Sequence, residues 1–142
     1  MKYAPTIAGI LLGLLFAVAA IPVLFHLIPP DKMPKPPTHE AEMFMGAFGT
    51  TGYLTFVKVL ELTGAILVAF PKTRNYGLLV LGPIIINILA YHQFLTKGAG
   101  LFNPMIVAIV VLALYLLWAG RKAFAGLLNS PSTPSQNERT LS

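Results

Sequence analysis

Two charged residues, Lys58 and Glu61, stand three positions apart inside an otherwise apolar stretch that runs from about residue 53 to residue 70. Positions i and i+3 share one face of a helix, and an unpaired charge in hydrocarbon costs at least about 2.5 to 3.5 kcal/mol on insertion scales. We therefore expect an ion pair. Such a pair can orient the polar head group of a quinone or a lipid and exchange protons with it, or it can join helices without any chemistry.

Asn87 and His92 lie in the following apolar stretch, from residue 76 to residue 95. Counted from the turn near Thr73 at about 1.5 Å per residue, Glu61 and Asn87 both reach a depth of roughly 15 Å. The sequence thus predicts a ladder of four polar groups, Lys58, Glu61, Asn87 and His92, which are our candidates for ligand binding or proton exchange. In the structural alternative, Asn87 bonds to the ion pair, because interhelical polar contacts in membranes contribute about 0.6 to 2 kcal/mol.

A second candidate site consists of two histidines. His26 and His92 lie near the same end of two apolar stretches, residues 7–28 and 76–95. Two imidazoles on facing helices can hold a b-type haem through its axial positions. The alternative is that both rings pack or form hydrogen bonds near a membrane interface.

The other motifs carry no self-contained catalytic chemistry. His39, Glu40 and Glu42 are metal-binding residue types, but the sequence HEAEM lacks the second histidine of a zinc-protease helix. We interpret it as a solvated loop and predict no metal site. The sequence contains no glycine-rich phosphate cradle and no Ser–His–Asp set. Because it has no cysteine, it offers no thiol redox centre and no iron–sulfur ligand, so any oxidoreductase role requires a bound cofactor or a partner.

The composition is that of a membrane protein. Of 142 residues, 56% are hydrophobic and 11% are charged, against roughly a quarter charged in soluble domains. A membrane-spanning helix needs about 20 mostly apolar residues. We predict an all-α integral membrane four-helix bundle of up-down topology within residues 1–128, with spans at about 7–28, 53–70, 76–95 and 101–119. A cleaved signal peptide is the alternative reading of the first stretch, because Ala17-Val18-Ala19 resembles a cleavage site.

The connections between the spans contain several local signals. Residues 29–52 begin as a proline-rich loop, and from Thr38 onward they favour a short surface helix with Thr38 as N-cap and Phe44, Met45 and Phe48 on its apolar face. Asn103 and Pro104 are suited to begin the fourth helix. Residues 129–142 are rich in proline and serine, which predicts a disordered cytoplasmic tail.

Lysines and arginines predict the orientation. Five of them favour one side of the membrane (Lys2, Lys72, Arg74, Arg121 and Lys122) and three the other (Lys32, Lys35 and Lys97). Because cytoplasmic loops are enriched in such residues, both termini are expected in the cytoplasm, and we expect the protein in a bacterial inner membrane. The net charge of +5 is explained in the same way, and no nucleic-acid partner is predicted.

The central hairpin resembles that of the DoxX-like family of small four-helix membrane proteins. The likeness rests on a K-x-x-E-x-x-G span that begins at Lys58, the turn Pro71-Lys72-Thr73-Arg74, and an N-x-x-x-x-H span from Asn87 to His92. It covers roughly residues 50 to 97. The family includes the membrane subunit of a thiosulfate:quinone oxidoreductase and proteins of redox and oxidative-stress complexes. The resemblance therefore implies a site at Lys58, Glu61, Asn87 and His92, and without cysteine a sulfur intermediate would need a partner subunit.

These observations lead to one expectation and two alternatives. We expect an accessory or quinone-facing subunit of a membrane redox complex, surrounded by lipid and by other membrane or redox subunits, with a quinone as its cofactor or substrate. The first alternative is a purely structural subunit that packs in a larger membrane assembly. The second is a b-type haem electron carrier.

Overall fold

The computed structural model describes residues 3–128, and every regular element in that range is helical. The predicted all-α class is confirmed. Six α-helices follow one another, with a 3₁₀ turn η1 (Pro30–Lys32) after the first and a π-helical turn η2 (Tyr91–Leu95) after the fourth: α1 (Ala4–Leu24), α2 (His39–Thr50), α3 (Tyr53–Ala69), α4 (Arg74–Ala90), α5 (Pro104–Ala119) and α6 (Arg121–Leu128). The predicted tail at 129–142 lies outside the described residues.

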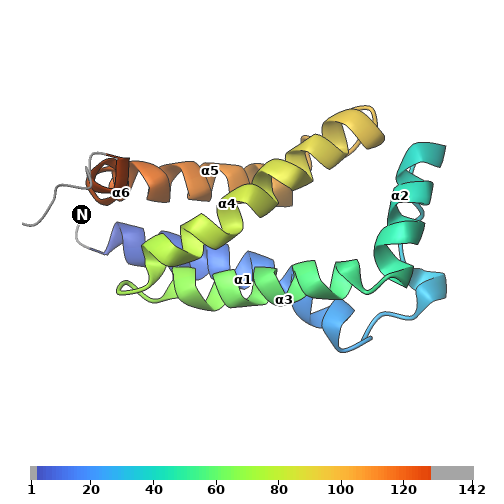
Figure 1. The fold of residues 1–142 in the computed structure, drawn as a ribbon, viewed down its shortest axis with the longest axis horizontal. Coiled ribbons are helices and arrows are strands. Elements are labelled where there is room, and N and C mark those ends of the chain that lie inside the picture. The colour runs from blue at the N-terminus through green and yellow to red at the C-terminus, as the bar shows by residue number, and fades with distance from the viewer. Residues whose placement is uncertain (1–2, 129–142) are drawn as a thin grey trace, which may run out of the picture.

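Helices α1, α3 and α5 run along the long axis of the molecule, and α4 crosses it obliquely, from the α3–α4 turn toward the end at which α2 stands (Figure 1). Helices α1 and α3 lie side by side, and the α3–α4 turn, α6 and the beginning of α1 gather at one end, whereas α2 stands across the opposite end. The buried core runs between these four helices and includes Leu12, Phe16, Val68, Leu81 and Leu116, each almost inaccessible. The core therefore fills the bundle on the side away from α2.

Glycines in α1 allow the close contact between α1 and α3. A Cβ atom at Gly9 would lie 2.5 Å from the carbonyl oxygen of Val68, and one at Gly13 would lie 2.6 Å from that of Ala65. Small residues four positions apart let two helix backbones approach where lipid provides no hydrophobic force between helices. The Gly9–Gly13 pair thus fixes the spacing of the two helices.

Helix α1 ends at Leu24, four residues before the predicted end at residue 28. Beyond it, the amide of Leu27 donates to the carbonyl of Pro22 over 2.8 Å, and the amide of His26 donates to that of Val23 over 3.3 Å. His26 has a φ of 51°. This is the hydrogen-bond pattern of a Schellman cap, in which the left-handed residue ends the helix. Hydropathy did not predict the end of α1 at Leu24, because the following residues Phe25, Leu27 and Ile28 are as apolar as the helix.

Helix α2 is the short helix predicted after the proline-rich loop. The Thr38 hydroxyl oxygen accepts a hydrogen bond from the amide of Ala41 over 3.1 Å, so the predicted N-cap is confirmed. The same hydroxyl donates to the carbonyl of Leu95, which ties the start of α2 to η2. At its other end, Gly52 adopts a φ of 78°, and α2 and α3 are bent by 82° relative to each other. This bend turns α2 across the end of the bundle.

Helices α4 and α5 follow the predicted stretches closely, with one addition. Asn103 caps α5, since its side-chain oxygen accepts from the amide of Met105 over 2.9 Å. Helix α4 continues into η2, where the amide of Thr96 donates to the carbonyl of Tyr91, five residues back. Helix α6, which was not predicted, follows α5 at an angle of 68°.

By length and composition, two helices are suited to cross a membrane: α1, and α4 together with η2 (Arg74–Leu95). Helices α3 and α5 have 17 and 16 residues, and 17 residues span only about 26 Å. Each passes the same test when joined to its bent neighbour, which raises the number of candidate spans to as many as four in the described part of the chain.

Candidate functional site

Lys58 and Glu61 form the predicted ion pair on α3. The ammonium nitrogen of Lys58 donates to Oε2 of Glu61 over 2.9 Å. The Glu61 side chain is 4% exposed and that of Lys58 is 16% exposed. Because both residues belong to one helix, the pair by itself connects no second element.

The pair faces a cavity of about 310 Å³, here called the inner cavity, between α2, α3 and α4. Most of its lining side chains are apolar, and those that carry a polar group are Lys58, Glu61, Asn87, Tyr91 and His92. Drug-sized ligands occupy pockets of roughly 300 to 1,000 Å³ that are lined in this way, with a few convergent polar groups. The four predicted site residues are therefore brought together around one cavity.

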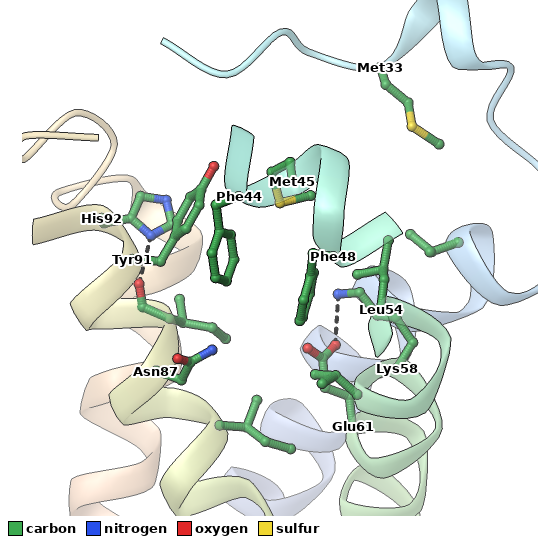
Figure 2. A pocket seen from close by; sticks show the side chains of 14 residues that line it. Met33, Phe44, Met45, Phe48, Leu54, Lys58, Glu61, Asn87, Tyr91 and His92 are labelled. Carbon is green, nitrogen blue, oxygen red and sulfur yellow. Dashed lines mark hydrogen bonds and ion pairs between the residues drawn. The ribbon is translucent and has the colours of Figure 1, made fainter. Parts of the chain in front are cut away.

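Helix α2 supplies aromatic side chains that close one end of the inner cavity. Phe44 and Phe48 project from it between α4 and α3 (Figure 2), with ring centroids 5.1 Å apart and nearly parallel planes. Phe44 contacts Tyr91 on the α4 side at 5.6 Å, and Phe48 contacts Tyr53 on the α3 side at 4.9 Å. A row of aromatic rings thus bridges the two helices above the ion pair.

The sequence placed Phe44 and Phe48 on the apolar face of the surface helix, but it did not predict that they line a cavity. The signal available was the i, i+4 spacing of Phe44 and Phe48, which indicates a common helix face and says nothing about what that face covers. No role was predicted for Tyr91, which lies in the apolar stretch at residues 76–95. In the structure it lies between Phe44 and His92, with ring centroids 5.6 and 5.2 Å away.

Asn87 lies across the inner cavity from the ion pair, on α4 (Figure 2). It is exposed in the isolated chain and also lines a neighbouring cavity beside Phe44, Phe48 and Tyr53. Among the described residues no hydrogen bond joins Asn87 to Lys58 or to Glu61, so the interhelical bond of the structural alternative is not formed. The Asn87 amide therefore has both a donor and an acceptor to offer to a ligand.

His92 lies at the upper end of the site, in η2. Its Nδ1 is 2.9 Å from the carbonyl oxygen of Ile88. Since a carbonyl can only accept, Nδ1 carries the proton of this bond, and in the neutral ring Nε2 keeps a free lone pair. His92 and Tyr91 also line a second cavity, here called the outer cavity, together with the loop at Pro34–Pro37 and the turn at Thr96–Gly100.

Of the two histidines proposed as haem ligands, only His92 lines the inner or the outer cavity. His26 is exposed in the turn that ends α1 and lines neither of the cavities that His92 lines. The backbone position of His26 is explained by its role in the helix cap. His39, Glu40 and Glu42 lie in the first turn of α2, and no group of three or more metal-ligating side chains is found in residues 3–128.

Comparison with known proteins gives one relative of unknown activity. Over 84 residues, 59% of this chain, the sequence is 27% identical to the uncharacterized protein YwoB of Bacillus subtilis (strain 168). The chain covers 53% of that protein and thus spans about half the length of the curated relative it matches. No family model matches the chain, and no solved structure matches it.

Proposed function

We propose that the chain is an integral membrane protein whose four long helices cross the bilayer as an up-down bundle, with both termini in the cytoplasm. Large apolar side chains are exposed around the outer faces of all four helices, among them Leu14, Val18, Ile66, Ile86, Val111 and Leu114. An exposed apolar surface of this extent is expected where lipid is the solvent. Helices α2 and α6, bent away from α3 and α5, would then lie near the two membrane surfaces.

We further propose that the inner cavity binds the ring of a quinone-like molecule. The observation that carries this proposal is that an ion pair with a buried carboxylate faces an aromatic-lined cavity, with an amide across from it that bonds to neither partner. Taking two charges out of water costs several kcal/mol per ion unless good contacts repay it. A pair that joins no helices is best explained by a ligand that uses it.

The donors and acceptors suit both oxidation states of a quinone. Lys58 has three N–H groups, of which one is used on Glu61. Its remaining protons and the NH₂ group of Asn87 can donate to the carbonyl oxygens of the oxidised ring. Glu61 and the Asn87 carbonyl can accept from the hydroxyl groups of the reduced ring. Phe44, Phe48 and Tyr91 offer faces and edges for a flat ring at one end of the cavity.

In this proposal the protein is an accessory or quinone-facing component of a membrane redox complex. The resemblance of residues 50–97 to the DoxX-like family supports it, because redox complexes contain members of that family. The chain has no cysteine, so electrons would come from another subunit. Its own residues would hold the ring, exclude water from it and exchange its protons.

The test is to measure, by titration calorimetry, the binding of a short-chain benzoquinone to the full chain in lipid nanodiscs. Hydrogen bonds to charged groups contribute about 1.5 to 3 kcal/mol, so the double variant Lys58→Met/Glu61→Gln should lose roughly 10- to 100-fold in affinity. The double variant removes both charges together and leaves no unpaired ion. The matched control is Lys97→Gln, in the turn after η2 and outside the inner cavity.

Two results would contradict the proposal. One is the absence of saturable quinone binding by the folded wild-type protein. The other is an unchanged affinity in the double variant, which would leave the ion pair with a structural role and favour a subunit that only packs in a larger assembly. Circular dichroism of each variant provides the check on folding.

A further inference from the structure

His92 lies at the junction of two cavities. The inner cavity contains the ion pair, whereas the outer cavity, of about 320 Å³, lies between the proline-rich loop and the turn after η2. Three residues, Met45, Tyr91 and His92, line both of them, and among these histidine is the side chain that gains and loses a proton between about pH 5 and 8.

The backbone holds the imidazole ring in one orientation. The bond from Nδ1 to the carbonyl of Ile88 points back along α4, and the other ring nitrogen points away from the helix (Figure 2). On that side stands Gly100, at which a Cβ atom would lie 3.2 Å from Cδ2 and 3.5 Å from Nε2 of His92. Gly100 has a φ of 78°, a conformation that glycine adopts without strain. The glycine thereby leaves Nε2 uncovered toward the outer cavity.

The local backbone is unusual at the same point. Residues 91–95 form a π-helical turn, an arrangement that is rare and is frequently found at functional sites. The turn is braced by Thr96, whose single hydroxyl proton is shared between the carbonyl oxygens of His92 and Ala99, which lie 2.7 and 2.8 Å from the hydroxyl oxygen. Its other attachment is the bond from Thr38 to Leu95. The position of His92 is therefore fixed by backbone contacts on both sides.

We propose that His92 passes protons between water in the outer cavity and the inner cavity. At the junction of the two cavities, Nε2 takes up a proton from a hydronium ion that enters through the outer cavity, which gives an imidazolium ring and water. It then transfers that proton to a water molecule or ligand atom that reaches the junction from the inner cavity, which restores the neutral ring. Nδ1 keeps its proton on the Ile88 carbonyl throughout. This inference rests on the proposed function for its purpose, since a bound quinone takes up and releases protons when it changes oxidation state.

The charged and titratable groups around His92 fit such a route. Lys35 of the proline-rich loop lines the outer cavity, and Tyr91 lies beside His92 in η2. Across the inner cavity stand Lys58 and Glu61, whose opposite charges balance. Within the described residues no carboxylate lines the outer cavity, so the ring has no ion-pair partner on that side.

The first test is nitrogen NMR of histidine-labelled full chain in nanodiscs. The sequence has three histidines, so His26→Gln and His39→Gln assign the signals. We expect the neutral His92 ring to carry its proton on Nδ1 and Nε2 to titrate with the pH of the bulk solution. A neutral ring protonated on Nε2, or a ring that does not respond to bulk pH, would overturn the proposal.

The second test measures the delivery of protons to the inner cavity in the absence of quinone. The ammonium protons of Lys58 report proton exchange there, and their signal is identified by its loss in Lys58→Met. We expect His92→Ala to slow their exchange with water by about a hundredfold, the lower end of general acid–base effects, and free imidazole to restore the rate. His39→Ala, at the start of α2, is the matched control and should exchange as the wild type does.

These readouts separate the two proposals. An unchanged Lys58 exchange rate in folded His92→Ala would overturn the proton route even if quinone binds. A chain that binds no quinone but shows the expected tautomer, titration and exchange would contradict the proposed function and leave the proton route in place.

Discussion

Lys58 and Glu61 pair over 2.9 Å within a single turn of α3, and the pair faces a cavity instead of a neighbouring helix. From the sequence, the same two residues could either bind a ligand or join helices. Their geometry in the structure distinguishes between these two roles. An intrahelical pair contributes little to holding helices together, because the partner that would connect it to α4, Asn87, stands across the cavity without bonding to it. The consequences for stability and for binding can therefore be measured separately.

The ion pair should show strong coupling in a double-mutant cycle. Lys58→Met leaves the Glu61 carboxylate buried and unpaired, which should lower the free energy of unfolding by about 3 kcal/mol. The double variant Lys58→Met/Glu61→Gln should recover most of that loss, because it contains no uncompensated charge. Unfolding in mixed micelles, monitored by circular dichroism, gives the free energies of unfolding of Lys58→Met, of Glu61→Gln and of the double variant, which complete the cycle. Additive losses in the double variant would contradict the pairing.

The contact between α1 and α3 should not tolerate a methyl group. In a free helix Ala is more favourable than Gly by about 1 kcal/mol, yet at Gly13 the added Cβ would lie 2.6 Å from a backbone oxygen that cannot move aside. We expect Gly13→Ala to destabilise the protein by about 1 to 3 kcal/mol. Gly82→Ala, where nothing lies within 4 Å, is the control and should be neutral or stabilising. Equal thermal stability of the two variants would refute the close approach.

The attachment of α2 should depend on Thr38. Its hydroxyl caps α2 and donates to the carbonyl of Leu95. Loss of an N-cap typically costs about 1 kcal/mol, so in Thr38→Val the amides of α2 should exchange with deuterium several-fold faster while those of α1 keep their rates. In the control Thr50→Val, the lost hydroxyl bonds only to Gly46 within the same helix. If both variants exchange alike, Thr38 does not hold α2 in place.

The distribution of charge predicts the orientation that we propose. Four basic residues lie at one end of the bundle (Figure 1): Lys72 in the α3–α4 turn, Arg74 at the beginning of α4, and Arg121 and Lys122 at the beginning of α6. Acidic side chains at Asp31, Glu40 and Glu42 lie in the segment that carries α2, at the opposite end. A reporter fused after residue 142 should therefore be active in the cytoplasm. Activity on the opposite face would reverse the proposed topology.

Local sequence signals were sufficient for most helices. The capping residues Thr38 and Asn103 begin α2 and α5 as predicted, because a cap depends on one side chain and the next few amides. The ion pair was also predictable, since positions i and i+3 meet on any helix. The end of α1 was predicted too late, because its Schellman cap uses His26 in a conformation that is more typical of glycine and leaves no mark on hydropathy.

The sequence by itself determined the helices, their apolar character and the pairing of Lys58 with Glu61, because each of these depends on residues that are close in the chain. Only the tertiary structure decided what the pair faces. The inner cavity exists because Gly52 turns α2 across the end of the bundle and η2 brings Tyr91 and His92 to meet it. That arrangement depends on contacts between residues that are far apart in the chain, such as Phe44 and Tyr91. No local sequence pattern predicts how such residues pack.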